Sequence, residues 1–148
     1  MIVKHADVTQ AVIGLFYQVY NVLGYGFLEG VYSNAMALAG RKLGLEILRE
    51  VPICVRFEGS IVGKYYADMV VNHAVIAEVK ACRSLAEEHE AQLLNYLKAT
   101  EFEVGLLLNF GPRAQIKRLV YDNEKKGGMS WCNTDAHGFT RKNTDKNR

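Results

Sequence analysis

Three ionisable side chains interrupt sequence that is otherwise typical of buried strands. Asp68, Glu78 and Lys80 lie in the segment 65–81, which reads YYADMVVNHAVIAEVKA. A charged carboxylate in an apolar strand costs several kcal/mol unless it is paired, protonated or bound to a cation. A divalent cation shared by Asp68 and Glu78 would remove this cost. Mg²⁺ suits such an oxygen-only site when water and a substrate phosphate complete it.

The spacing of these residues decides whether they meet on one face of a sheet. Glu78 and Lys80 are two positions apart, so in a strand both side chains emerge on the same face. A two-residue loop would pair Asp68 with Ala77 and separate the acids, whereas a three-residue loop at 72–74 pairs Asp68 with Glu78. In that second register Lys80 could orient an attacking water or offset the charge of a phosphoryl transition state. A structural ion-pair cluster is the competing interpretation of the same three residues.

The elements that must position these residues follow from the apolar pattern. It predicts the order helix, helix, strand, strand, strand, helix, strand, strand. Helices are expected at about residues 7–23, 28–43 and 85–100, and Ser84 with Glu87 matches a capping box for the third. The first strand is expected at 51–57, and the second follows the turn EGS and ends at residue 71. Three further strands are expected at 74–81, 104–110 and 115–122.

This order predicts an α/β fold with a mixed central β-sheet flanked by helices on both faces. The third helix can serve as the crossover between two parallel central strands, one of which is the near-continuous apolar segment 74–81. Residues 1–121 are expected to form a single domain. Residues 122–148 are polar and poor in aliphatic side chains, which predicts a disordered tail.

Charge and composition exclude several classes of protein. Of the 18 Lys and Arg and 16 Asp and Glu, residues 122–148 hold six and four, which leaves twelve of each in a neutral body. A general basic field for non-specific DNA binding is therefore absent. No stretch approaches the roughly 18 uncharged apolar residues that span a membrane, and the N-terminus lacks a signal-peptide pattern, so a cytoplasmic location is expected. Cys54, Cys82 and Cys132 form no CxxC pattern and predict neither disulfides nor a zinc site.

Four motifs in the same order carry a family resemblance. The segment DMVVNHAVIAEVK resembles the D-x(n)-E-x-K signature of the PD-(D/E)xK nuclease superfamily. GFLEGVY, HEAQLLNYLKA and VGLLLNFG are similar to segments of the GxxExxY family within it. The resemblance runs from about Val8 to Val120, although Tyr20 stands where this family often has histidine and GYG replaces the commoner GPG.

The resemblance implies a restriction-endonuclease-like core of helix, three strands, helix and strand, with phosphodiesterase activity that depends on Mg²⁺ or Mn²⁺. In it, Asp68 and Glu78 match the metal-binding acids and Lys80 matches the catalytic lysine. Glu29 matches an acid that faces the metal site from the preceding helix. It could equally be a helix N-terminal acid favoured by the macrodipole.

The resemblance also implies roles for residues around the third helix. Gln92 and Tyr96 match a QxxxY motif, and their spacing of four places both on one helix face. Gln92 could hold a water or a phosphate oxygen in catalysis, and Tyr96 is a candidate for substrate binding. Arg83, shortly after the strand that carries Lys80, is the best phosphate-binding candidate among the basic residues. Polar residues at a helix rim and a solvated basic face are the plainer interpretations.

Sequence therefore favours a metal-dependent nuclease acting on nucleic acid, either DNA or RNA. The alternative is a catalytically silent module that binds nucleic acid or a protein partner through the same cleft. A small homo-oligomer-forming domain is a third possibility. Metal binding by Asp68 and Glu78 discriminates between these functions, because an adaptor has no need of it.

Overall fold

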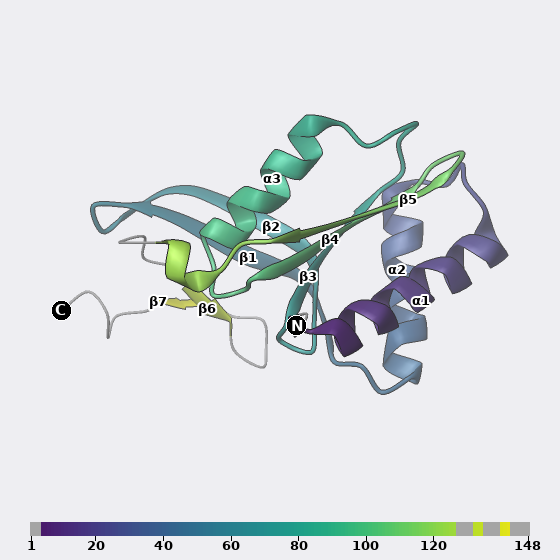
Figure 1. The fold of residues 1–148 in the computed structure, drawn as a ribbon, viewed down its shortest axis with the longest axis horizontal. Coiled ribbons are helices and arrows are strands. Elements are labelled where there is room, and N and C mark those ends of the chain that lie inside the picture. Colours follow the sequence, from purple (N-terminus) through teal and green to yellow (C-terminus); the bar gives the residue numbers. More distant parts are fainter. Residues whose placement is uncertain (1–3, 127–131, 135–139, 143–148) are drawn as a thin grey trace.

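The computed structural model describes residues 4–126, 132–134 and 140–142 (Figure 1). The helices are α1 (Ala6–Leu23), α2 (Glu29–Lys42) and α3 (Glu87–Lys98), with a short 3-10 helix η1 (Asn123–Lys126). The main strands are β1 (Ile47–Phe57), β2 (Ser60–Val71), β3 (Val75–Lys80), β4 (Val104–Phe110) and β5 (Ala114–Val120). A separate small pair consists of β6 (Cys132–Thr134) and β7 (Thr140–Lys142).

The main sheet has five strands in the order β1-β2-β3-β4-β5. Its neighbouring strands are antiparallel except for β3 and β4, which are parallel and are joined by α3 as a crossover. The predicted α/β fold with a mixed central sheet is confirmed. None of the described helices is long and apolar enough to cross a membrane.

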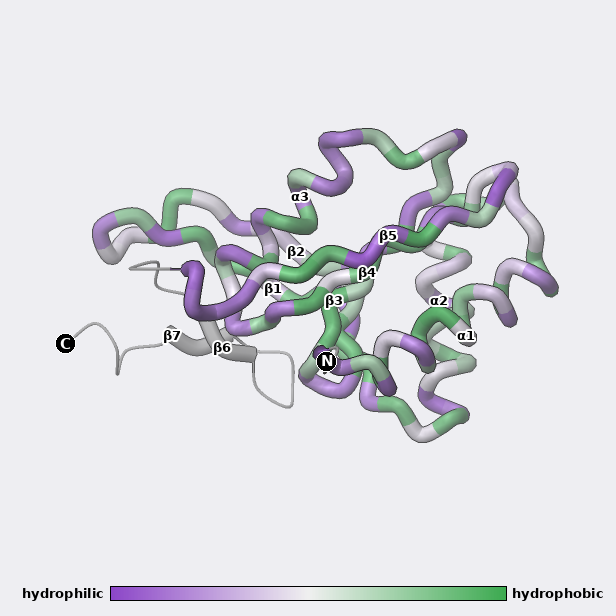
Figure 2. Tube along the Cα trace, in the orientation of Figure 1, coloured by the Kyte–Doolittle hydropathy of each residue, from purple (hydrophilic) through white to green (hydrophobic). Residues whose placement is uncertain are grey.

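Helices cover both faces of the sheet, and each face has its own apolar cluster. On one face α1 and α2 pack on the sheet, with Phe16 and Tyr32 buried near Phe110. On the other face Leu93 and Leu97 of α3 pack over the central strands. The central strand β3 is buried along most of its length between the two helical layers, and it is hydrophobic (Figure 2) except at Glu78 and Lys80.

Tyr32 belongs to the core. Its ring is fully buried and stacks on Phe110 with centroids 4.2 Å apart and planes at 11°. Its hydroxyl donates a hydrogen bond to Gly24 O (2.7 Å) and accepts one from the Phe27 N–H (3.2 Å). These bonds fix the elbow between α1 and α2, and so they fix where α2 begins.

The start of α3 differs from the prediction. The helix begins at Glu87 with Ala86 at the N-cap, so Ser84 and Glu87 form no capping box. Instead the Ala86 N–H donates to His89 Nδ1 at 3.0 Å, and the His89 N–H donates to Ala86 O at 3.0 Å. A histidine thus supplies the side-chain acceptor that the motif assigned to glutamate.

Part of the predicted disordered tail has structure. Residues 123–126 form η1, and the buried Lys126 donates from Nζ to Thr100 O and Phe102 O, both at 2.7 Å. An ammonium that bonds two backbone carbonyls can be buried where an unpaired one could not. β6 and β7 also fall within the predicted tail. Residues 127–131, 135–139 and 143–148 lie outside the described residues, so disorder there stays a prediction.

Candidate functional site

The loop between β2 and β3 sets the register that brings the two acids together. It consists of the three residues Asn72–Ala74, as predicted. The two strands pair Val71 with Val75 and Met69 with Ala77, so Asp68 and Glu78 are the next position on each strand beyond the paired residues. The prediction of a three-residue loop is therefore confirmed.

Asp68 and Glu78 are held by each other's backbone. The Asp68 N–H donates a 2.7 Å hydrogen bond to Glu78 Oε2, and the Val79 N–H donates a 2.7 Å hydrogen bond to Asp68 Oδ2. Carboxylate oxygens thus take the place of backbone acceptors at the end of the β2–β3 ladder. The second oxygen of each side chain, Asp68 Oδ1 and Glu78 Oε1, accepts no hydrogen bond within the described part of the chain.

An irregularity in β1 and β2 accompanies this arrangement. In a regular strand Ala67 and Met69 would lie on one face. Here Met69 packs in the cluster under α1 and α2, whereas Ala67 packs in the cluster under α3. The change of face falls at Asp68, and on β1 Glu50 has a φ of 51°, a left-handed conformation that is uncommon for a residue other than glycine. Asp68 therefore sits where the regular pleat breaks.

Burial makes the pair a poor place for two negative charges. Glu78 is only 4% exposed, and burial followed by repulsion from Asp68 raises its pKa to about 8. Burial also raises the pKa of Asp68, although the hydrogen bond from Val79 and the attraction of Lys80 act against this. Without a cation the acid pair consequently retains a proton near neutral pH.

The donor set fits a divalent cation. Asp68 and Glu78 each fix one oxygen on a backbone N–H and leave the other oxygen for a ligand. A cation would neutralise the repulsion that raises their pKa values. Mg²⁺ commonly binds through one or two carboxylates and completes its shell with water and substrate phosphate.

Glu29 does not complete a three-acid metal centre. It is exposed at the start of α2, and the described residues contain no group of three His, Cys, Asp or Glu side chains that could hold a metal. Its negative charge nevertheless raises the pKa of both Asp68 and Glu78. Glu29 thus acts on the pair at longer range than the resemblance implied.

Lys80 follows Glu78 by two positions on β3, but its ammonium group is not paired directly with either acid within the described part of the chain. Its charge works to lower the pKa of both Asp68 and Glu78. Among the described residues, however, no ion pair of 4.0 Å or less joins Lys80 to either acid. Lys80 is half-buried, and its ammonium group can interact with a bound water or phosphate.

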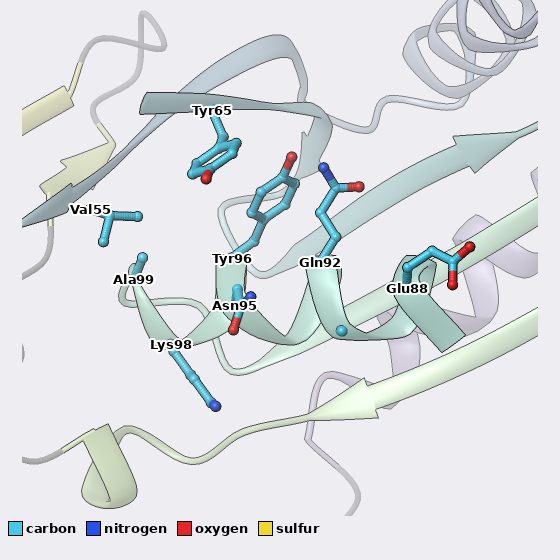
Figure 3. Close-up of a pocket in the computed structure, with 9 residues that line it drawn as sticks. Val55, Tyr65, Glu88, Gln92, Asn95, Tyr96, Lys98 and Ala99 are labelled. Carbon is cyan, nitrogen blue, oxygen red and sulfur yellow. The ribbon is translucent and has the colours of Figure 1, made fainter. Parts of the chain in front are cut away.

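Gln92 and Tyr96 line a groove between α3 and the β1–β2 hairpin (Figure 3). The cavity has a volume of about 450 Å³. Burial, together with the negative charges of Glu78 and Asp68, raises the pKa of Tyr96 to about 12, so its hydroxyl remains a hydrogen-bond donor at neutral pH. Asp68 and Glu78 do not line the groove, but they lie close enough for their charges to act on Tyr96 within it.

Arg83 lies apart from this groove, in the exposed segment between β3 and α3. Asn109 and Gln115, which the sequence analysis did not single out, hold this segment. Asn109 Oδ1 accepts from the Cys82 N–H at 2.9 Å, and Asn109 Nδ2 donates to Cys82 O at 3.0 Å. Gln115 Oε1 accepts from the Leu85 N–H at 3.0 Å. The sequence signal that could have identified Asn109 is its position, because it is the one polar side chain in the apolar segment VGLLLNF.

The family assignment agrees with this geometry. The family model of the PD-(D/E)XK nuclease superfamily matches residues 6–119, which include the acid pair and the whole main sheet except the last residue of β5. The chain belongs to the PD-(D/E)XK nuclease superfamily. Nucleases of this superfamily generally use divalent metal ions and act on nucleic acid. Comparison with curated proteins and comparison with solved structures each gave no significant match.

Proposed function

We propose that the protein is a metal-dependent nuclease that hydrolyses phosphodiester bonds of DNA or RNA. The observation that carries the proposal is the Asp68–Glu78 pair, in which backbone hydrogen bonds of 2.7 Å fix one oxygen of each carboxylate and leave the other open. A pair with only a structural role would be expected to bond a cationic side chain directly.

The residues divide the chemistry between them. Asp68 and Glu78 would hold Mg²⁺ or Mn²⁺, which supplies Lewis-acid activation of the phosphate and a more acidic bound water. Lys80, on the same face of β3 as Glu78, donates hydrogen bonds to the attacking water or to a phosphate oxygen and offsets charge in the transition state. Gln92 holds a water or a phosphate oxygen through its amide.

Other features belong to the same proposal. Tyr96 contacts substrate from the groove, Arg83 binds a flanking phosphate, and Glu29 tunes the charge of the metal site from α2. Membership of the GxxExxY family within the superfamily is part of the proposal, and the resemblance of the motifs GFLEGVY and HEAQLLNYLKA supports it. A cytoplasmic location and a homo-oligomeric or partner-bound state complete the proposal.

Cleavage of labelled substrates tests the proposed activity. Single-stranded and duplex DNA and RNA are incubated with the wild-type protein and Mn²⁺, with Glu78→Gln as the inactive variant and Glu58→Gln as the matched control. Glu58 is exposed in the β1–β2 turn and lies outside the site. Wild type and Glu58→Gln should cleave at least one substrate, and Glu78→Gln should lose about 10²-fold or more of the rate.

Absence of cleavage by the wild-type protein, with nucleic acid still bound, would overturn the proposal in favour of a catalytically silent binding module. Equal cleavage by wild type and Glu78→Gln would show that the activity does not come from this site.

A further inference from the structure

The groove between α3 and the β1–β2 hairpin has more aromatic and amide surface than phosphodiester hydrolysis alone requires. Its lining includes Tyr65 of β2 and Gln92, Asn95 and Tyr96 of α3. A volume of about 450 Å³ lies within the range of small-molecule sites, roughly 300–1,000 Å³. The groove is thus large enough for one nucleoside.

The two tyrosines form a stacking platform. Tyr65 and Tyr96 lie side by side in the lining of the groove (Figure 3), with ring centroids 5.8 Å apart and planes at 45°. Because the rings are tilted rather than stacked, neither covers the full face of the other. Tyr65 is 47% exposed although it lies on the face of the sheet that α3 covers. Its ring therefore has a free face for a planar ligand.

The amides beside the platform can recognise the edge of such a ligand. Gln92, which is half-buried, and Asn95, which is exposed, lie three positions apart on α3, and neither side chain forms a hydrogen bond within the described part of the chain. Each amide offers both donors and an acceptor. This combination matches the donors and acceptors on the edge of a nucleobase.

The charge of the groove argues against a phosphate as its occupant. Its charged lining residues are Glu88 and Lys98, one of each sign. Lys98 Nζ lies 5.6 Å from the centroid of the Tyr121 ring, so its ammonium is directed toward that ring. Stacking on aromatic rings, in contrast, needs no net charge.

We propose that this groove binds one unpaired nucleobase next to the scissile phosphate, so that the substrate is a single-stranded segment or a frayed end of DNA or RNA. The inference rests on the proposed nuclease function, and it names the substrate class for that site. A base inside a duplex is stacked on both faces and cannot enter the groove without being extruded. Tyr65 stacks on the base, Asn95 bonds its edge, and Gln92 can use one end of its amide for the base edge and the other for the water or phosphate oxygen.

Binding measured without turnover tests the proposal. The Glu78→Gln protein is titrated, in Mg²⁺ buffer, against labelled single-stranded DNA and RNA 10-mers, the corresponding duplexes, and a single strand in which abasic residues replace the nucleosides. Tyr65→Ala, Tyr65→Phe and Tyr66→Ala are made in the same background. Tyr66 is the matched control, because it is equally exposed on β2 but does not line the groove.

The single strand should bind more tightly than the duplex or the abasic strand. Tyr65→Ala should weaken single-strand binding about tenfold or more, while Tyr65→Phe and Tyr66→Ala stay within about twofold. The DNA and RNA arms identify which single strand is preferred.

The inference fails if Tyr65→Ala binds as tightly as its parent, or if the abasic strand or duplex binds as tightly as the single strand. Its failure is distinguishable from failure of the nuclease proposal, because this binding assay needs no cleavage. Duplex cleavage by a fully active Tyr65→Ala enzyme would overturn the base-binding groove alone. Base-dependent binding by a wild-type protein that cleaves nothing would overturn the nuclease activity alone.

Discussion

Asp68 and Glu78 are linked by a reciprocal pair of backbone-to-carboxylate hydrogen bonds: the Asp68 N–H donates to Glu78 Oε2 at 2.7 Å. The reciprocal bond runs from the N–H that follows Glu78, on Val79, to Asp68 Oδ2 at 2.7 Å. These bonds hold two repelling carboxylates in place before any metal binds. Preorganisation of this kind removes the cost of assembling the site during catalysis.

Replacing one acid should make the metal-free protein less sensitive to alkaline pH. The pKa of Glu78 is raised to about 8 from an ordinary value of 4.5, so folding favours the protonated acid. Its contribution to stability is fully present below about pH 4.5 and is lost as pH rises through 8. Glu78→Gln should therefore be more stable than wild type by roughly 1–3 kcal/mol at pH 8.5 in chelator, with a smaller difference at pH 5.

Urea unfolding at the two pH values measures this difference, with Glu58→Gln as the control. Parallel pH dependence in wild type and Glu78→Gln would contradict the raised pKa.

Metal binding and catalysis should separate between the acids and the lysine. Asp68→Ala and Glu78→Ala should each lose Mn²⁺ binding, because each removes a carboxylate ligand. Lys80→Ala should bind Mn²⁺ at least as tightly as wild type, since it removes a neighbouring positive charge, but it should lose cleavage. Calorimetric titration with Mn²⁺ and a cleavage assay on the same preparations provide the two readouts.

Lys42→Ala, at the exposed end of α2, is the matched control for the lysine. Wild-type cleavage by Lys80→Ala, or unchanged Mn²⁺ binding by the acid variants, would remove the proposed division of roles.

Two glycine substitutions should have opposite effects on stability. A Cβ at Gly14, inside α1, meets nothing within 4 Å, so Gly14→Ala should stabilise the protein by about 0.5–1 kcal/mol. A Cβ at Gly111 would lie too close to Cys82 O and to Asn109 Nδ2, so Gly111→Ala must displace the segment that follows β3. Thermal melts should show a rise for the first variant and a fall for the second. A neutral Gly111→Ala would mean that this segment yields easily.

Removing the buried amide of Asn109 should be more costly than removing an exposed one. Asn109 is fully buried and bonds both the N–H and the carbonyl of Cys82. Asn109→Ala leaves these groups without their partner and should cost roughly 2–4 kcal/mol. Asn95→Ala, exposed on α3, should stay within about 0.5 kcal/mol. Denaturant unfolding compares them, and equal midpoints would show that Asn109 is dispensable for stability.

The register of the acid pair could be predicted from sequence, because few loop lengths place Asp68 and Glu78 on the same face of the sheet. Burial requires Asp68 and Glu78 to share a compensating partner, and only the three-residue loop gives both side chains one face. The order of helices and strands was predicted for the same reason, since the apolar periodicity of α1 and the unbroken apolar run of β3 leave little choice.

Other features depend on tertiary contacts that sequence does not display. Glutamate has no preference for a left-handed backbone, so nothing in the residue type announces the φ of 51° at Glu50. Ser84 matches a capping motif. In the structure, however, Asn109 and Gln115 bond the backbone of Cys82 and Leu85, and α3 begins only at Glu87. Tyr65 resembles any exposed strand residue until α3 is placed beside it.

The loop at 72–74 also decides where this chain can be lengthened by an engineer. One residue added there would give Asp68 a new partner on β3 and dismantle the acid pair without touching either acid. A peptide tag placed between Glu58 and Gly59, at the far end of the β1–β2 hairpin, leaves the pairing of β2 with β3 as it is. That turn is accordingly the insertion point for a fluorescent or affinity label that must report on an intact site.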